Sequence, residues 1–305
     1  MSELPKNGRA YVLATAAYNE EANIEKTIQS MLAQNELPQR WVIVSDGSVD
    51  KTDEIVQRYA AQHDFIHFLR VTRPPGRSFR TKIMALQAGI ELLSDVAYQY
   101  IGNLDADISI GPSYFADLID KFERNLTLGI AGGFVHEGKD GEFRTRSSNR
   151  VYSVAHAAQL VRRECYEAIK GYAILEYGGE DWHAQTSARM MGWSAEAFPE
   201  LPISHHRPTG TGDILIRHKF RQGRMDYSLG SEPIFETFKC LQRLREKPLI
   251  LGSFARLTGF FWSLMIREPR PVSAEFIAFL RAEQKQKTMS LLHLGRRPDR
   301  SFGVH

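Results

Sequence analysis

Two aspartates separated by one residue, Asp105 and Asp107, are the part of the sequence best suited to chemistry. They follow an apolar run, and in an extended chain residues i and i+2 project to the same side, so their carboxylates should converge. Two such carboxylates repel each other unless a cation lies between them. Mg²⁺ and Mn²⁺ prefer oxygen ligands from one or two carboxylates together with substrate phosphates. The pair therefore predicts a divalent-metal site, and a plain surface loop is the alternative.

A second polar cluster, Asp46-Gly47-Ser48, lies between an apolar run and a helix-like segment. Asp, Gly and Ser are favoured at helix starts because of their local hydrogen bonds, so an ordinary capping turn is one interpretation. Contact with a nucleotide is the other. The sequence has no GxGxxG after its first apolar run and no GxxxxGK[ST] anywhere. A dinucleotide enzyme and a P-loop NTPase therefore lose their main support.

The scaffold for these clusters is an alternation of strand-like and helix-like segments in the first two thirds of the chain. The strand-like runs are residues 11–16, 41–44, 67–71 and 98–104. Such alternation predicts right-handed crossovers and an α/β fold with a mostly parallel sheet flanked by helices. Ligands of such sheets bind beyond the carboxyl ends of the strands. The polar clusters after the first, second and fourth strands should therefore face one crevice.

The pattern is looser beyond residue 110. Residues 130–135 and 194–198 resemble strands, residues 181–191 a helix, and the polar stretch 136–150 a loop. From Gly230 onward the chain has a helical and basic character. We therefore predict an α/β domain that binds the ligand over residues 8–229 and a helical, basic C-terminal region over residues 230–305.

Five motifs follow one another with consistent order and spacing. They are Ala16-x-Tyr18-Asn19-Glu20-Glu21, Ser45-Asp46-Gly47-Ser48-x-Asp50-x-Thr52, Lys82-x-x-Ala85-Leu86-x-Ala88-Gly89, Leu104-Asp105-Ala106-Asp107 and Gly179-Glu180-Asp181-Trp182. This set resembles family 2 glycosyltransferases with the GT-A fold, a Rossmann-like architecture, and five ordered motifs are far more specific than one. The resemblance implies an inverting transfer from a nucleotide-diphosphate sugar, with Mn²⁺ or Mg²⁺ as the cofactor.

The resemblance also implies roles for single residues. Tyr18 and Glu20 would contact the nucleoside and Asp46 its base. Lys82 would lie near the diphosphate, Asp105 near the ribose and the metal, and Asp107 on the metal. The donor-binding set is therefore Ala16, Tyr18, Glu20, Asp46, Lys82 and Asp105. Ala16 stands where the family usually has Pro, and Gln87 where it usually has Asn. Neither position takes part in the reaction, so these departures affect loop geometry and leave the mechanism unchanged.

Asp181 is the expected general base. An inverting transfer needs one base on the face opposite the leaving group, and a carboxylate suffices because the acceptor loses its proton late. Asp181 lies in the first turn of a helix-like segment, so an ordinary acidic N-terminal turn is the alternative. The QxxRW signature of processive polysaccharide synthases is missing from the sequence, which favours the addition of a single sugar.

Two further clusters come after Asp181. Either His205 or His206 is a candidate third metal ligand, as in many related GT-A enzymes, and we favour His206. Beyond them lies a glycine-flanked basic stretch that includes Arg221 and Arg224. Because guanidinium forks bind phosphate bidentately, these two arginines are predicted to close over the diphosphate. A solvated basic helix face is the alternative.

The composition fits a globular protein in a reducing compartment. The 305 residues are 43% hydrophobic and 25% charged, which argues against a disordered chain. The two cysteines, Cys165 and Cys240, cannot build a disulfide framework or a four-thiolate zinc site. Residues 1–10 lack the apolar core of a signal peptide, so we expect a cytoplasmic location.

The charge is unevenly distributed. Residues 1–204 carry 21 Lys and Arg against 27 Asp and Glu, whereas residues 205–305 carry 18 against 9. This balance predicts an anionic partner for the C-terminal third. Residues 248–266 form an apolar stretch around Arg256. A central Arg costs about 2.5–3.5 kcal/mol on insertion scales, which favours a helix lying in the membrane interface over one that crosses it. A core helix is the alternative.

Taken with the resemblance, these features predict an enzyme that adds one sugar to an acceptor hydroxyl at the inner face of the plasma membrane. The expected acceptor is a polyprenyl-linked saccharide of a surface-polysaccharide pathway. A sugar-nucleotide pyrophosphorylase is an alternative, although residues 14–21 lack its glycine-rich basic loop. A non-catalytic nucleotide-sugar scaffold would not need Asp105, Asp107 and Asp181. No nucleic-acid partner is expected, since interleaved stacking aromatics are missing.

Overall fold

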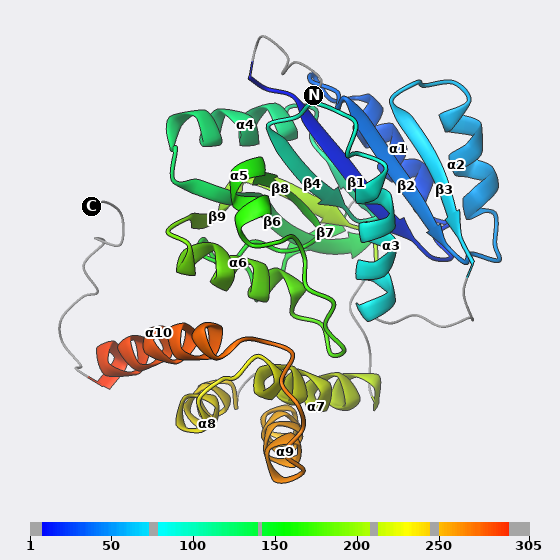
Figure 1. Ribbon diagram of the computed structural model, residues 1–305. Coiled ribbons are helices and arrows are strands. Elements are labelled where there is room, and N and C mark those ends of the chain that lie inside the picture. The colour runs from blue at the N-terminus through cyan, green and yellow to red at the C-terminus, as the bar shows by residue number, and fades with distance from the viewer. Residues whose placement is uncertain (1–7, 73–78, 140–141, 208–212, 245–249, 293–305) are drawn as a thin grey trace. The chain divides into compact units, whose positions relative to one another are not determined.

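The structure, a computed structural model, describes residues 8–72, 79–139, 142–207, 213–244 and 250–292. Contacts within the chain divide it into two units, one before and one after residue 210. Figure 1 shows the first as a sheet covered by helices and the second as a group of helices.

One sheet forms the centre of the first unit. Its strands are β1 (Tyr11–Ala17), β2 (Arg40–Asp46), β3 (Ile66–Val71), β4 (Tyr100–Leu104), β5 (Ile108–Ile110), β6 (Leu128–Lys139), β7 (Glu142–Thr145), β8 (Ala158–Arg162) and β9 (Ser194–His205). Their order is β3-β2-β1-β4-β8-β6-β9-β5, with β7 paired to β6. Strands β3, β2, β1 and β4 are parallel neighbours, and β8 is antiparallel to β4 and β6. The predicted mostly parallel α/β sheet is confirmed.

Helices cover both faces of this sheet (Figure 1). Helices α1 (Ile24–Leu32), α2 (Thr52–Ala60) and α4 (Tyr114–Arg124) supply side chains to the core on one face, and α3 (Phe79–Glu91), α5 (Arg163–Ala168) and α6 (Glu180–Met190) to the core on the other. Strand β1 explains the arrangement: Leu13 packs into the first core, whereas Val12 and Ala14 pack into the second. A strand between two helical layers must be apolar on both sides, which accounts for the uninterrupted apolar runs.

The carboxyl ends of β1, β2 and β4 lie at one edge of the sheet. Ala17 of β1 pairs with Ser45 of β2, and Ala14 pairs with Asn103 of β4. The loops after these three strands therefore start side by side. This edge is where ligands of open α/β sheets bind.

The polar segment predicted as a loop at residues 136–150 is in part a hairpin, so that prediction was wrong. Strand β6 continues to Lys139 and pairs antiparallel with β7, with His136 opposite Thr145. Strand β7 is largely exposed. Because no core covers this ribbon, its sequence lacks the apolar alternation by which strands are recognised.

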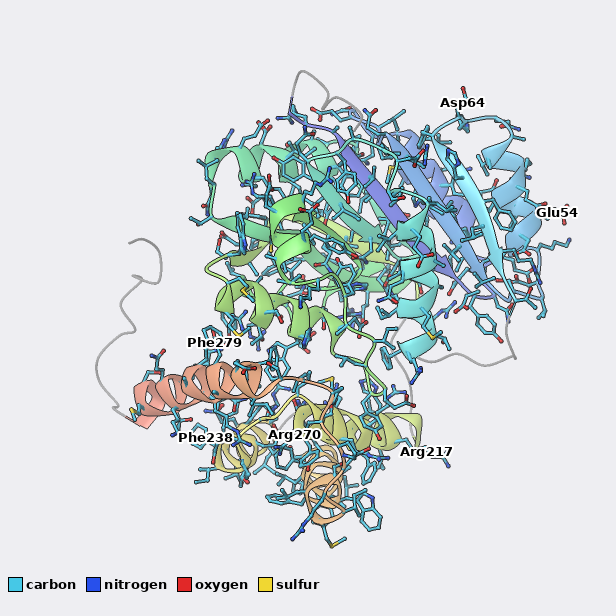
Figure 2. All side chains as sticks on the ribbon, viewed as in Figure 1. Glu54, Asp64, Arg217, Phe238, Arg270 and Phe279 are labelled. Atoms are coloured by element: carbon cyan, nitrogen blue, oxygen red, sulfur yellow. The ribbon has the colours of Figure 1, made fainter. Side chains whose placement is uncertain are left out.

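The second unit consists, in its described residues, of α7 (Asp213–Ser228), α8 (Pro233–Gln242), α9 (Leu251–Met265) and α10 (Ala274–Leu292). Helices α7 and α9 approach at their backbones: a Cβ at Gly223 would overlap the carbonyl of Arg256, and one at Gly259 that of Phe220. Beyond α9, the Arg270 guanidinium lies 4.4 Å from the ring centre of Tyr227 on α7 (Figure 2). The sequence-based boundary after residue 229 therefore differs from the observed division, since α7 packs with the C-terminal helices.

A buried cluster of charges joins α7, α8 and α9. Arg256 lies 2.6 Å from Asp226 and 3.1 Å from Glu236, and Lys239 lies 3.0 Å from Asp226 and 2.5 Å from Glu236. Two cations thus balance two anions. The arginine in the middle of the apolar stretch therefore faces partners in its own unit. None of the helices in the described part of the chain combines the length and the hydropathy needed to span a membrane.

Candidate functional site

Lys82, on α3, is the centre of the candidate site. Its Nζ lies 2.7 Å from Asp105 Oδ1, directly after β4. Burial alone would lower the pKa of Lys82, but the charges of Asp105, Glu180 and Asp107 raise it above its ordinary value. Burial raises the pKa of Asp181, and the Lys82 charge opposes this rise. The four acidic side chains singled out here therefore share the electrostatic field of one ammonium group.

Asp105 and Asp107 contact different groups. Residues 105–107 form a turn between β4 and β5 and are not extended, so the i, i+2 geometry expected from the sequence does not apply. Asp105 pairs with Lys82, whereas Asp107 Oδ1 lies 3.5 Å from His205 Nε2 and Asp107 Oδ2 lies 3.7 Å from Arg207 Nε. His205 is the last residue of β9 and Arg207 follows it, and both lie near Asp107 because β9 pairs antiparallel with β5.

The histidine beside Asp107 is His205, not the favoured His206. The His206 backbone N–H donates to the Asp107 carbonyl at 2.9 Å, but its imidazole Nε2 lies 2.7 Å from Ser109 Oγ. The His206 ring also lies edge-on to Phe143. Neighbouring residues in an extended chain point to opposite sides, so only one of the two imidazoles can reach the Asp107 carboxylate. Within the described ranges, no group of three or more His, Cys, Asp or Glu side chains is assembled for a metal.

Arg207 is a site residue to which the sequence reasoning assigned no role. Its Nη2 lies 2.5 Å from Oε2 of Glu20, a carboxylate that is only 1% exposed. Together with its approach to Asp107, this contact links the loop after β1 to the turn after β4. Its position directly after the histidine pair was the available signal.

Hydrogen bonds join the loops after β1 and β2. Asn19 N–H donates to Ser48 Oγ at 3.1 Å, and Val49 N–H donates to Asn19 Oδ1 at 2.9 Å. Asn19 has φ 53°, a left-handed conformation that Asn tolerates better than most residues. Glu20 N–H donates to the Thr52 hydroxyl at 2.8 Å. These bonds hold two of the five motifs together.

The remaining predicted donor residues of the first unit lie at the same sheet edge. Ala16 is the penultimate residue of β1, Tyr18 follows the strand and is half-buried, and Asp46 is the buried last residue of β2. The parallel register of β1 with β2 and β4 brings them level with Asp105. The structure thus gathers Ala16, Tyr18, Glu20, Asp46, Lys82, Asp105, Asp107 and Asp181 in one unit.

Glu180 and Asp181 open α6 after Gly179, whose φ of 92° is left-handed. Glu180 is 5% exposed, and its Oε2 has no hydrogen-bond partner among the described residues. Burial, and then the Asp181 charge, raise the pKa of Glu180 to about 7. Burial also raises the pKa of Asp181, whose Oδ1 accepts a hydrogen bond from Trp182 N–H at 2.7 Å. Glu180 is therefore a second buried acid that composition and spacing did not single out.

Substitution of Glu180 by Gln should stabilise the protein more at pH 8 than at pH 5. The pKa of Glu180 is about 7 in the folded chain against 4.5 ordinarily, so folding favours the protonated carboxyl. Its contribution to stability is complete below pH 4.5 and is lost as the pH rises through 7. Glutamine cannot ionise and avoids this loss. Thermal unfolding at the two pH values, with the exposed Glu176→Gln as control, measures the difference, and an equal gain at both would contradict it.

Arg221 and Arg224 belong to the second unit, on α7. Arg224 donates to Glu268 at 2.8 Å and to the Ser263 hydroxyl at 3.3 Å, so it binds α7 to the end of α9. Arg221 Nη2 lies 3.1 Å from His218 Nδ1. Each arginine therefore has a contact within its own unit, and their predicted closure over a diphosphate stays a prediction.

A comparison with protein families matches this chain to one of them. The model described as glycosyl transferase family 2 covers residues 13–184. That range contains all five motifs in full, and the fifth, which includes Asp181, lies near its end.

Curated relatives include poly-beta-1,6-N-acetyl-D-glucosamine synthases of staphylococci. The Staphylococcus epidermidis enzyme is 34% identical over 119 residues, which are 39% of this chain and 26% of the synthase. The enzyme of Staphylococcus aureus strain COL is 32% identical over 118 residues, again 39% and 26%. The matched part thus amounts to about a quarter of the length of these relatives.

Solved structures with a similar fold are glycosyltransferases. The mannosyltransferase PcManGT from Pyrobaculum calidifontis, in complex with GDP-Man and Mn²⁺, matches with a TM-score of 0.55 at 17% identity, over 97% of this chain and 83% of its own. Residues 1–349 of S. aureus TarS, in complex with UDP-GlcNAc, match with a TM-score of 0.54 at 12% identity, over 93% and 85%. At such identities the likeness concerns the fold, which agrees with the expected GT-A architecture.

Proposed function

Since the chain belongs to glycosyl transferase family 2, we propose that it transfers one sugar from a nucleotide-diphosphate sugar to an acceptor hydroxyl, with inversion at the sugar. The observation that carries the proposal is the gathering of Asp105, Asp107, Glu180 and Asp181 around the Lys82 ammonium. In open α/β sheets the carboxyl edge is the place where a phosphate-bearing ligand binds.

The donor would lie along the loops after β1, β2 and β4. Tyr18 and Glu20 would contact the nucleoside, Asp46 the base and Asp105 the ribose, with Ala16 at the floor of the loop. Lys82, now paired with Asp105 at 2.7 Å, would gain a second anion in the diphosphate. Arg207 is a further candidate for diphosphate contact because its guanidinium lies between Glu20 and Asp107.

A divalent cation such as Mn²⁺ fits the groups around Asp107. The Asp107 carboxylate and the His205 Nε2 face each other at 3.5 Å, and oxygen with imidazole nitrogen is a donor set that Mn²⁺ accepts. We therefore assign the ligand role to Asp107 and His205, with His205 in place of His206, whose imidazole is paired with Ser109. Asp105 is the third proposed ligand, although its carboxylate pairs with Lys82 in this structure. When bound, the cation would supply the counter-charge for the diphosphate.

Asp181 would act as the general base. As the acceptor oxygen bonds to the anomeric carbon, the bond from that carbon to the diphosphate breaks, and the hydroxyl proton passes to the Asp181 carboxylate. The nucleoside diphosphate leaves with the bonding electrons. Burial raises the pKa of Asp181, which makes its carboxylate a stronger base than an exposed aspartate. The Lys82 charge opposes that rise and so favours the ionised carboxylate.

The proposed acceptor is a polyprenyl-linked saccharide of a polysaccharide pathway, used at the inner face of the plasma membrane. The excess of positive charge in residues 205–305 supports an anionic surface as the partner. The names of the staphylococcal relatives support polysaccharide synthesis as the setting. The missing QxxRW signature supports the addition of one sugar.

A nucleotide sugar should raise the melting temperature of the protein when Mn²⁺ is present. A ligand at 100 times its Kd stabilises the folded state by about 2.7 kcal/mol. A panel of nucleotide sugars with UDP-GlcNAc and GDP-Man among them, scanned with Mn²⁺ and with EDTA, would identify the donor. Slow hydrolysis of the donor that raises the melting temperature would then distinguish an enzyme from a scaffold. If the protein instead used pyrophosphate to split the nucleotide sugar into a nucleoside triphosphate and a sugar phosphate, the pyrophosphorylase would be favoured.

A further inference from the structure

Helix α9 has its polarity reversed relative to an ordinary surface helix. The side that packs on α7 and α8 carries mostly small or polar residues, with Phe260 as its large apolar side chain. The buried residues are Gly252, Ser253, Ala255, Arg256, Gly259, Phe260 and Ser263. The opposite side carries large apolar side chains that are exposed. Phe254 and Met265 are each 68% exposed, and Trp262 is 48% exposed. A soluble helix normally buries its apolar side, so this arrangement needs an explanation beyond the fold of the unit.

The exposed apolar residues form one continuous stripe, the α9 stripe, made of Leu251, Phe254, Phe261, Trp262 and Met265. Their spacing of three, seven, one and three residues keeps them on one side of the helix, because neighbours three, four and seven apart lie on the same face. Contiguous exposed apolar surface of this kind marks an interaction site.

A cationic cavity lies at the start of the same helix. Its lining consists of Lys219 on α7, Cys240 and Arg243 on α8, and Gly252, Ser253 and Arg256 on α9. Three of the six lining residues are cationic, and none is acidic in the part of the chain that is described. Arg256 is balanced by Asp226 and Glu236, so Lys219 and Arg243 supply the charge that would attract an anion. Among the described residues, no side chain caps the first turn of α9. Its backbone N–H groups therefore add to the attraction for an anion.

The cavity and the stripe are adjacent. Gly252 and Ser253 line the cavity, and they alternate within one helical turn with Leu251 and Phe254 of the stripe. A cationic cavity next to an apolar stripe matches a ligand in which an anionic head group is joined to a hydrocarbon chain. We propose that the cavity binds the phosphate of an anionic lipid while the α9 stripe contacts its hydrocarbon. The further step, that this lipid carries the acceptor saccharide, rests on the proposed function.

Charge favours a lipid surface over a second copy of the chain. Helix α9 contains no acidic residue, and the exposed Arg267 follows its end while Arg243 and Lys219 lie at its start. Two copies joined through this stripe would bring cationic ends together, which is unfavourable. An aromatic stripe with cations at both ends is typical of a helix lying at an anionic bilayer surface.

The test is flotation of the full chain with phosphatidylcholine vesicles that either contain or lack phosphatidylglycerol. The wild-type protein should float with the anionic vesicles, and Arg243→Glu should weaken this binding on the order of tenfold or more. Phe254→Ser combined with Trp262→Ser should remove the part of the binding that persists in high salt.

Two control variants change residues away from the cavity and the stripe. Lys285→Glu on α10 makes the same change of charge as Arg243→Glu, and Ile234→Ser on α8 removes an exposed apolar residue. Both controls should bind the vesicles like the wild type.

Several outcomes would overturn the inference. They are a failure of the wild-type protein to float, an equal loss with the two control variants, or binding by the Arg243→Glu variant at wild-type strength. Inorganic phosphate is the second arm: if it raises the melting temperature of the wild type and no vesicle binds, the cavity is a site for free phosphate and the lipid assignment fails. Donor hydrolysis, measured without vesicles, separates this result from a failure of the proposed function, because flotation needs no donor.

Discussion

Asp181→Asn is expected to abolish sugar transfer while donor binding is preserved. The amide keeps the shape of the carboxylate and can still accept the Trp182 hydrogen bond at its oxygen, but it cannot take the proton of the acceptor hydroxyl. Loss of a general base costs on the order of 10²–10⁴ in rate. The measurements are the rate of donor hydrolysis, with water as the acceptor, and the shift in melting temperature that the donor produces.

The matched control for this variant is Glu180→Gln, in the neighbouring position. Glu180 is buried and its pKa is raised to about 7, so it is largely protonated in the folded chain below that pH and should tolerate the amide. If Asp181→Asn merely raised the KM for the donor, or if Glu180→Gln cost more turnover than Asp181→Asn, the base role would move to Glu180.

The central sheet could be predicted from the sequence because its strands are buried on both sides. Helices cover both faces of β1 and β2, so these strands are uninterrupted apolar runs, and the polar clusters at their ends mark the site edge. The β6–β7 hairpin could not be predicted in this way, since the end of β6 from His136 onward and the whole of β7 lie outside both cores and are mostly polar. The hydrophobic pattern of a sequence indicates which residues are buried, and it indicates secondary structure only where one side of an element is buried.

The contacts within the site depend on how segments that are distant in the chain pair with each other. No local pattern in a single sequence indicates this pairing. His205 faces Asp107 because β9 pairs with β5 with Ile108 opposite His205. A shift of one residue in that register would have presented His206 in its place. Likewise, the helical spacing of α9 is visible in the sequence. Which side packs depends on Gly223 of α7 and on the carboxylates of Asp226 and Glu236, which receive Arg256.

Asp107→Ala is expected to eliminate turnover and to weaken binding of the nucleotide diphosphate. The variant removes the carboxylate that faces both His205 and Arg207, so the proposed cation would lose a ligand and the diphosphate its counter-charge. Because metal stabilisation of a charged transition state is worth several kcal/mol, donor hydrolysis should fall on the order of 10³ or more. Hydrolysis with Mn²⁺ and calorimetric titration of the nucleoside diphosphate are the two measurements.

Comparison with EDTA distinguishes a metal role for Asp107 from a structural one. In the wild type, EDTA should reproduce the loss of turnover and of nucleotide affinity, and in Asp107→Ala it should change neither, because the two treatments remove the same counter-charge. Asp64→Ala is the control: Asp64 is exposed in the loop before β3, at the amino end of that strand (Figure 2). Full activity of the wild type in excess EDTA would remove the metal from the mechanism. It would leave Asp107 as the residue that holds Arg207, whose guanidinium would then be the cation available to the diphosphate.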